Sequence, residues 1–206
     1  MIKAVIFDMG GVILDLDMAR CVRNFKEMAG FSNIVGYLDI YHQKGFIGDF
    51  EEGILSEDEF YAECLRHCKE GTSPRDIEYC FNSLIAGPDS DVIRQIRELS
   101  RDYDLYVLSN NNPICSRKFL EILDEEGIAS CFKGLFFSFR MKMLKPGREI
   151  YDEAVRRTGL RPEEILFIDD SAANVEGAKA AGINAILFKK GDNVLSECYL
   201  PRPAVH

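Results

Sequence analysis

The sequence has no long hydrophobic run. No apolar stretch approaches the roughly 18 residues that a membrane-spanning helix needs. The first residues, Met1 to Phe7, resemble the start of a folded strand, and they lack the basic segment and cleavage site of a signal peptide. These absences argue against a membrane protein and against a secretory leader.

Positive charge is also in short supply, because 25 lysines and arginines face 34 aspartates and glutamates. The net charge is −9 and the isoelectric point is about 4.9. Proteins that bind nucleic acids or anionic membranes carry the opposite excess. We therefore expect no nucleic acid and no membrane among the partners, and we expect local positive charge to bind any anionic substrate.

Residues typical of zinc sites are few and unpaired. The chain has three histidines, and its seven cysteines, an odd number, are scattered through apolar segments. This usage is typical of reduced thiols in a cytoplasmic protein. Cys64 and Cys68 share a predicted helix face, but no matching Cys or His pair accompanies them, so a shared metal is disfavoured.

What the chain does have is enough apolar content for a core. Its 206 residues are 47% hydrophobic, which suits one domain or one domain with a smaller insert. Expected strands cover residues 2–7, 105–109, 135–138, 165–168 and 185–188, and expected helices lie near 92–99, 114–126, 150–155 and 175–181. This alternation predicts a doubly wound parallel sheet with right-handed crossovers.

The segment from Asp17 to Gly87 differs, because its periodicity is helical throughout. Ser56 opens a capping box, and Ser73 is a good N-cap with Pro74 at the first helical position. Gly87 and Pro88 end the block. We predict roughly four helices between the first strand and the remainder of the chain.

The first predicted strand ends in a carboxylate followed by glycines. Asp8 closes the run from Ile2 to Phe7, and Gly10 and Gly11 allow a sharp turn and a close approach by a ligand. The carboxyl end of a strand in an open α/β sheet is where such folds bind ligands. Taken alone, Asp8 could equally be an N-cap or loop residue.

Polar clusters also follow the next two predicted strands. Residues 109–112, Ser-Asn-Asn-Asn, could hold an anion with neutral donors, although turns and N-caps use the same residue types. Lys142 and Lys145 follow the strand at 135–138, and Pro146 restricts the backbone next to Lys145. Lys145 could neutralise a phosphate oxygen, and a solvated surface lysine is the alternative.

The fourth cluster is acidic. Asp169, Asp170 and Ser171 follow the strand at 165–168, with Asn174 close behind. Adjacent carboxylates repel each other unless a cation or hydrogen-bond donors compensate. The oxygen-only surroundings suit Mg²⁺, and a pair of N-cap acids is the alternative.

In this order and context, the four clusters resemble the motifs of the haloacid dehalogenase-like (HAD) hydrolases. The matching stretches are Phe7-Asp8-x-Gly10-Gly11-Val12, Leu108-Ser109-Asn110, Lys145-Pro146 and Ile168-Asp169-Asp170. The resemblance implies a three-layer α/β/α doubly wound parallel sheet with an inserted small helical cap domain. Residues 1–15 and 89–206 would form the core domain, and residues 16–88 the four-helix cap.

A finer resemblance is to one bacterial branch of the family. Residues 52–60 and 143–151 look closest to sugar-phosphate phosphatases that include α-D-glucose-1-phosphate phosphatase. The resemblance implies a Mg²⁺-dependent phosphatase acting on a small phosphorylated metabolite, such as a hexose 1-phosphate. The expected partner is a small-molecule phosphate ester, and the expected assembly is a monomer or homodimer.

The family resemblance also implies roles for individual residues. Asp8 would be the nucleophile that forms an aspartyl-phosphate, and Mg²⁺ would be bound by Asp8, Asp170 and the carbonyl of Gly10. Phosphate oxygens would be bound by Ser109, Asn110 and Lys145, and Asp169 and Asn174 would lie beside the metal site.

Gly10 departs from the common pattern. Most phosphatases of the family carry a second aspartate two residues after the nucleophile, which acts as general acid and base, and a glycine cannot transfer a proton. The sugar-phosphate branch also has glycine there. A replacement proton carrier could come from the cap, where His42, Glu51 and Glu52 are candidates.

Two other functions fit parts of the sequence. In a 2-haloacid dehalogenase, Asp8 would attack carbon without a metal, but that reaction has no use for the Asp169-Asp170 pair. A non-catalytic relative would bind a phosphorylated metabolite or a partner protein, but the joint presence of Asp8, Ser109, Lys145 and Asp170 argues against lost activity.

Overall fold

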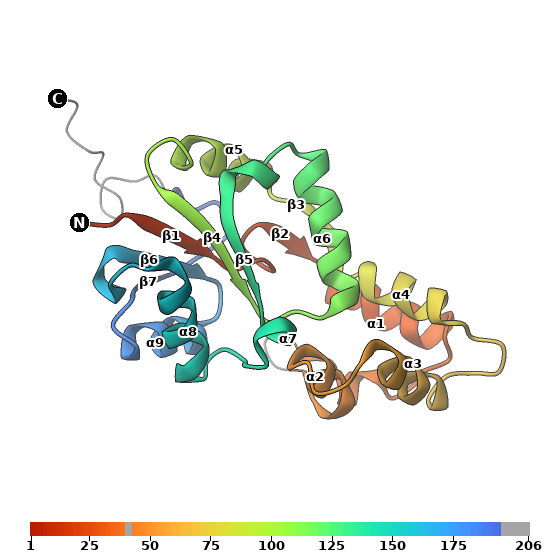
Figure 1. The fold of residues 1–206 in the computed structure, drawn as a ribbon. Coiled ribbons are helices and arrows are strands. Elements are labelled where there is room, and N and C mark those ends of the chain that lie inside the picture. The colour runs from red at the N-terminus through yellow and green to blue at the C-terminus, as the bar shows by residue number, and fades with distance from the viewer. Residues whose placement is uncertain (40–42, 195–206) are drawn as a thin grey trace.

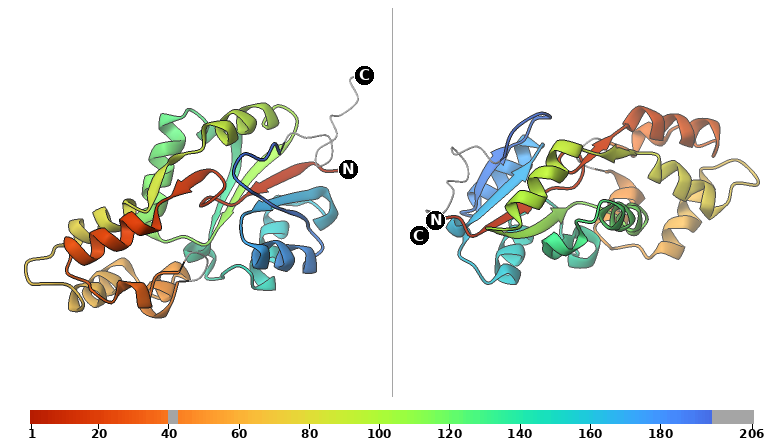
Figure 2. Two further views of the ribbon diagram at one scale, coloured as in Figure 1. Left: turned by 180° about the vertical axis from the view of Figure 1, so that it is seen from behind. Right: turned by 90° about the horizontal axis from the view of Figure 1, so that it is seen from above.

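The computed structural model describes residues 1–39 and 43–194. A central sheet carries helices on both faces, and a bundle of helices lies beyond one end of the sheet (Figure 1). This bundle lies at the opposite end of the molecule from the N-terminus, as both views in Figure 2 show.

The central sheet has five strands in the order β5-β4-β1-β6-β7. The strands are β1 (Ala4–Phe7), β4 (Asp104–Ser109), β5 (Phe132–Phe137), β6 (Ile165–Asp169) and β7 (Asn184–Leu187). All pairs are parallel, and β1 lies in the middle between β4 and β6. The chain reverses its direction of winding beside β1, so the ligand-binding crevice of such folds is expected at the carboxyl end of β1.

Each face of the sheet packs against its own pair of helices. Val5 and Phe7 belong to the apolar cluster that includes helices α5 (Ser90–Leu99) and α6 (Pro113–Glu125). Ala4 and Ile6 belong to the cluster with α8 (Arg148–Thr158) and α9 (Ala172–Ala180). This period-two alternation buries both faces of β1, and it confirms the predicted three-layer α/β/α class.

The bundle beyond the sheet contains the four predicted helices. They are α1 (Met18–Glu27), α2 (Gly45–Glu51), α3 (Glu57–Arg66) and α4 (Pro74–Asn82). Ser56 and Ser73 form capping boxes with Glu59 and Asp76, as their spacing predicts. An aromatic core fills the bundle, and Phe50 stacks on Phe60 with 3.9 Å between ring centroids.

Two short strands that the sequence does not predict join the bundle to the sheet. The strands β2 (Leu14–Leu16) and β3 (Ile85–Pro88) pair in antiparallel fashion. The segment from Asp17 to Gly87 is therefore not helical to its end, and Pro88 lies within a strand instead of ending the segment. Proline is tolerated here because a two-stranded ladder leaves each strand with one free edge. Arg20 strengthens the junction by donating to the carbonyls of Ser83 and Ile85.

Smaller corrections concern the strand ends. The strand predicted at 135–138 begins earlier, at Phe132, and Ser138 instead opens the short helix α7 (Ser138–Met141). The last strand ends at Leu187 rather than at Phe188. Three single-turn 3₁₀ helices complete the described elements, η1 (Ile34–Gly36), η2 (Ala129–Cys131) and η3 (Pro162–Glu164). Among the helices of the described residues, none is both long and apolar enough to span a bilayer.

Candidate active site

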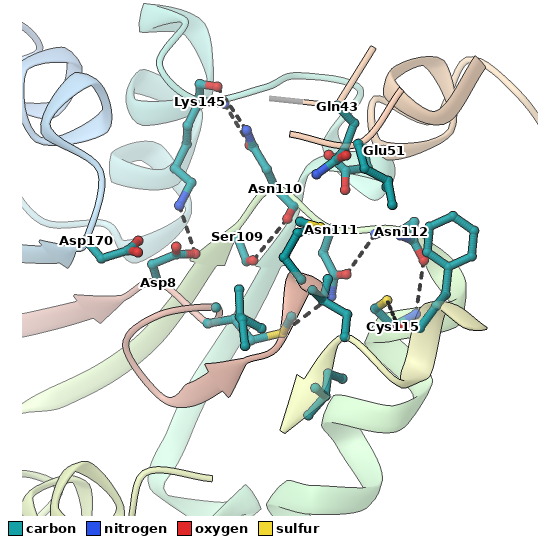
Figure 3. Close-up of a pocket in the computed structure, with 18 of the residues that line it drawn as sticks. Asp8, Gln43, Glu51, Ser109, Asn110, Asn111, Asn112, Cys115, Lys145 and Asp170 are labelled. Carbon is teal, nitrogen blue, oxygen red and sulfur yellow. Dashed lines mark hydrogen bonds and ion pairs between the residues drawn. The ribbon is translucent and has the colours of Figure 1, made fainter. Parts of the chain in front are cut away.

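The polar clusters meet at the carboxyl edge of the sheet. Asp8 directly follows β1, Ser109 ends β4, and Asp169 ends β6. Lys145 reaches the same place from the segment between α7 and α8. Figure 3 shows Lys145, Asp8, Asp170 and Ser109 around one pocket, which lies between the sheet edge and the helical bundle.

Lys145 is the buried cation of this pocket. Its side chain is 1% exposed, and its Nζ lies 2.9 Å from Asp8 Oδ1 and 2.7 Å from Asp169 Oδ2. Burial alone would lower the pKa of Lys145, but the two carboxylates outweigh it and raise the pKa. Lys145 therefore stays charged, and it holds Asp8 and Asp169 a fixed distance apart.

The Asp8 carboxyl lies on the floor of the pocket. Burial raises its pKa to about 7, the charge of Asp169 adds to this, and Lys145 opposes it. Burial and Asp169 likewise raise the pKa of Asp170. Each of these acids is costly to charge, so the pocket as a whole favours an additional cation.

Asp169 is held from several directions. Besides Lys145, its oxygens accept from the backbone N–H of Ser171 at 2.8 Å and from Asn174 Nδ2 at 3.1 Å. Asp169 is completely buried and does not line the pocket. It is therefore placed to orient Lys145 rather than to touch a ligand.

The acids fit a hard divalent cation. One carboxylate oxygen from each of Asp8, Asp169 and Asp170 lies within 4.8 Å of the others. Asp170 packs so tightly against Gly11 that a Cβ there would overlap its carboxylate, which explains the glycine. The Oδ1 atom of Asn174 is buried without a partner among the described residues, and an ion or its water would satisfy it. Oxygen donors of this kind suit Mg²⁺.

Ser109 and Asn110 differ in what they offer to a ligand. Both line the pocket, but the Asn110 amide is engaged with the backbone of Lys145, which it contacts through two hydrogen bonds of 2.8 and 2.9 Å. The Asn110 side chain therefore positions the Lys145 backbone. Among the described residues, the Ser109 hydroxyl makes only a long contact of 3.3 Å to the Asn110 carbonyl, so it can turn to a ligand.

Gly10 lines the pocket beside Leu16. A Cβ at Gly10 would come within 2.9 Å of Leu16 Cδ1, so the leucine side chain occupies the space next to the missing second aspartate. Because that atom is the end of a flexible side chain, a larger residue would fit after a small shift of Leu16.

The bundle supplies the opposite wall. Its lining residues are Met18, Leu38, Gln43, Glu51, Phe81 and Leu84. Of the three proton carriers suggested by the sequence, Glu51 lines the pocket, Glu52 does not, and His42 lies outside the described residues. The apolar residues and Gln43 were not predicted as site residues, because nothing in their local spacing shows that they face the sheet.

The sheet is doubly wound, and its buried carboxylates and buried lysine lie where the winding reverses beside β1. This arrangement is typical of an α/β enzyme whose chemistry uses acids and a cation. A sequence profile of the haloacid dehalogenase-like hydrolases matches residues 2–182, and the chain belongs to this family. The prediction of a HAD-like hydrolase is confirmed.

Similar proteins cover nearly the whole chain. The D-ribitol-5-phosphate phosphatase of Bacteroides thetaiotaomicron is 30% identical over 93% of this chain and 94% of its own. The phosphorylated carbohydrates phosphatase of Thermotoga maritima is 28% identical over 89% of this chain and 83% of its own. A crystal structure of a HAD family enzyme from B. thetaiotaomicron, in complex with magnesium and inorganic phosphate, has a TM-score of 0.84 at 28% identity and covers 97% of this chain and 100% of its own.

Proposed function

We propose that this protein is a Mg²⁺-dependent phosphatase that hydrolyses the phosphate monoester of a sugar or polyol. The observation that supports the proposal best is the group formed by Asp8, Lys145 and Asp170, which places a nucleophile, a cation and a second acid for a metal in one pocket, with Asp169 buried behind Lys145. The magnesium and phosphate bound by the similar crystal structure support it.

Asp8 acts as the nucleophile. Its carboxylate attacks phosphorus and forms an aspartyl-phosphate, which water then hydrolyses, so that one difficult displacement becomes two easier ones. Asp8 is suited to this because it lines the pocket while Lys145 fixes one of its oxygens, which leaves the other for attack.

Asp8, Asp170 and the Gly10 carbonyl hold the metal in this proposal. A bound Mg²⁺ supplies positive charge that cancels the repulsion between the nucleophile and the phosphate. Asp169 has its oxygens engaged by Lys145, Ser171 and Asn174, so we place it behind the metal site.

Ser109 and Lys145 bind the phosphate oxygens, the first with a neutral donor and the second with a full charge. Asn110 positions Lys145 through its two backbone hydrogen bonds. The Lys145 ammonium is fixed by Asp8 and Asp169 before the substrate arrives, and a charge held in place in this way stabilises a developing negative charge at least cost.

The relatives support the proposed substrate class. The two similar phosphatases act on D-ribitol 5-phosphate and on phosphorylated carbohydrates. The resemblance of residues 52–60 and 143–151 to the α-D-glucose-1-phosphate phosphatase branch favours a hexose 1-phosphate within the same class. We propose a phosphorylated sugar or polyol, with hexose 1-phosphates and pentitol 5-phosphates as the first compounds to test.

The domain division, assembly and location complete the proposal. The division into a core of residues 1–15 and 89–206 and a cap of residues 16–88 is supported by the β2–β3 ladder, which lies where the two parts meet. Six cysteines of the described chain are free thiols, in keeping with a cytoplasmic location. We expect a monomer or homodimer.

A phosphate-release screen tests the function. The protein is assayed with Mg²⁺ against sugar and polyol phosphates, beside the variants Asp8→Asn and Asp124→Asn. Asp124 is an exposed acid on α6 and serves as the matched control. We expect Asp8→Asn to abolish turnover, Asp124→Asn to retain it, and EDTA to remove it reversibly. Full activity in Asp8→Asn, or release of chloride from 2-haloacids without Mg²⁺, would contradict the proposal.

A further inference from the structure

The proposed mechanism leaves one proton without a carrier. In phosphoryl transfer the attacking and leaving oxygens lie roughly in line on opposite sides of phosphorus. Asp8 attacks from the sheet edge, so the leaving oxygen points toward the wall formed by the bundle. Gly10 offers no side chain to protonate that oxygen, and a sugar or polyol alkoxide is a poor leaving group without a proton.

Among the described residues of the bundle, Glu51 is the polar side chain that remains available in this position. Figure 3 shows Gln43 and Glu51 entering the pocket from the side opposite Asp8 and Asp170. The Gln43 amide is engaged, since it donates to the Asp39 carbonyl at 2.8 Å and accepts from the Asp39 N–H at 3.2 Å. The Glu51 carboxyl forms no hydrogen bond or ion pair with any other described residue.

Glu51 is also held firmly in place. Its carbonyl accepts from the hydroxyl of Ser138 at 2.6 Å, and the same hydroxyl accepts from the Asn111 N–H at 2.9 Å. Two residues later, Gly53 has a φ of 74° and lies so close to Phe139 that a Cβ would overlap the Phe139 carbonyl. The end of α2 is thus fixed against α7, at the edge of the sheet that holds Asp8.

The surroundings of the Glu51 carboxyl favour its protonated form. Burial, as the main cause, and the charge of Asp8 raise its pKa to about 8, while Lys145 opposes the rise. The Cys115 thiol faces it as well and has a raised pKa of its own. Burial is the larger cause, and it favours the protonated form, from which Glu51 can donate a proton.

We propose that Glu51 is the general acid and base of this enzyme, replacing the aspartate that the chain lacks at Gly10. The inference rests on the proposed phosphatase function and assigns a further residue to it. In the first step an Asp8 oxygen bonds to phosphorus as the bond to the leaving oxygen breaks. That oxygen keeps the electron pair, takes the Glu51 proton and departs as an alcohol.

The second step returns the proton. The Glu51 carboxylate takes a proton from the water whose oxygen attacks phosphorus, and the bond between phosphorus and Asp8 breaks. The products are inorganic phosphate and the Asp8 carboxylate, and Glu51 is again protonated. No other reactant is needed.

The test compares leaving groups in the variant Glu51→Gln, which keeps the shape of the side chain but cannot transfer a proton. The value of kcat/KM reports the first chemical step, including departure of the leaving group. We expect it to fall by about 10²–10⁴-fold for a polyol or sugar phosphate. We expect little change for 4-nitrophenyl phosphate, because nitrophenolate leaves without a proton.

Matched variants separate catalysis from structure. Glu52→Gln changes the neighbouring acid, which does not line the pocket, and should retain the wild-type kcat/KM for both substrates. Glu51→Asp keeps a transferable proton on a shorter arm and should retain part of the activity on the polyol phosphate. Thermal unfolding of each variant shows whether it is folded. If Glu51→Gln does not fold, the two substrates are compared with Glu51→Asp instead.

Two results would overturn the inference. One is an equal loss on both substrates in Glu51→Gln, which would show a structural role, and the other is no loss on either. Failure of the proposed function looks different, because the wild-type protein would then release no phosphate from any ester in the presence of Mg²⁺.

Discussion

Lys145 is the residue on which the electrostatics of the pocket depend. It is one cation beside three carboxylates, those of Asp8, Asp169 and Asp170. A phosphate dianion would meet a negative field in such a pocket, in a protein that already carries a net charge of −9. A divalent metal restores balance, and the same three acids that repel the substrate become the reason the metal binds.

Gly10 and Glu51 form a pair that a double variant can test. In the Glu51→Gln background, Gly10→Asp places a new carboxyl two residues after the nucleophile, next to Leu16. We expect it to recover part of the loss of about 10²–10⁴-fold in kcat/KM for a polyol phosphate, because a proton carrier is restored.

Gly10→Asn in the same background is the control, since it has the same shape and no transferable proton. Measurement of kcat/KM for both double variants shows whether proton transfer accounts for the recovered activity. Equal recovery by Asn and Asp would contradict proton transfer as the reason.

Among the helices, the end of α2 determines where Glu51 lies. Gly53→Ala should lower the free energy of unfolding by more than the about 1–2 kcal/mol that a positive φ alone costs, because the new Cβ would also overlap the Phe139 carbonyl. It should also lower kcat/KM by about 10²-fold, because the new Cβ pushes against Phe139 and displaces Glu51.

Gly71→Ala is the matched control for Gly53→Ala. Gly71 has a φ of 83° and open space around it, so the same backbone cost should appear without a loss of activity. Urea unfolding and steady-state kinetics on both variants give the comparison. A similar loss of activity in both would show that the contact with Phe139 is unimportant.

Helices with strong local signals could be predicted from the sequence, and paired short strands could not. The helices α3 and α4 begin directly after Ser56 and Ser73 because each serine caps its helix by bonding to a residue three positions later. The strands β2 and β3 are three and four residues long and exist only because distant segments pair. No local pattern identifies such a pair before the fold is known.

In the site, too, the sequence predicts what local patterns determine and does not predict contacts between distant segments. The sequence could bring Asp8, Ser109, Lys145 and the acids at 169–170 together, because the carboxyl ends of parallel strands meet at one edge. It could not show that the Asn110 amide binds the Lys145 backbone. Nor could it choose Glu51 over Glu52, because that choice depends on how the last turn of α2 faces the sheet.

At the scale of the whole molecule, stability should depend on pH through Glu164. Hydrogen bonds from Lys3, which lies just before β1, and from Arg161 lower the pKa of Glu164 from its ordinary 4.5 to about 2. A lowered pKa in the folded state means that the contribution is present above pH 4.5 and is lost as the pH falls toward 2.

Glu164→Gln should therefore lower the melting temperature at pH 7 and have a much smaller effect near pH 2.5. Glu163→Gln, which removes an exposed partner of Arg161, should change little at either pH. Thermal unfolding of the three proteins at both pH values checks this. An effect of Glu164→Gln that does not change with pH would contradict the assignment.

The β2–β3 ladder has a consequence for how such a molecule can be remodelled. It brings the two chain crossings between sheet and bundle to the separation of neighbouring strands, about 4.8 Å. The chain therefore enters and leaves the inserted segment at neighbouring positions. Any insert whose own ends meet at that spacing, from a tight hairpin to a larger domain, can be exchanged there without altering the order of the central strands. Substrate specificity and chemistry can therefore evolve in separate parts of the chain.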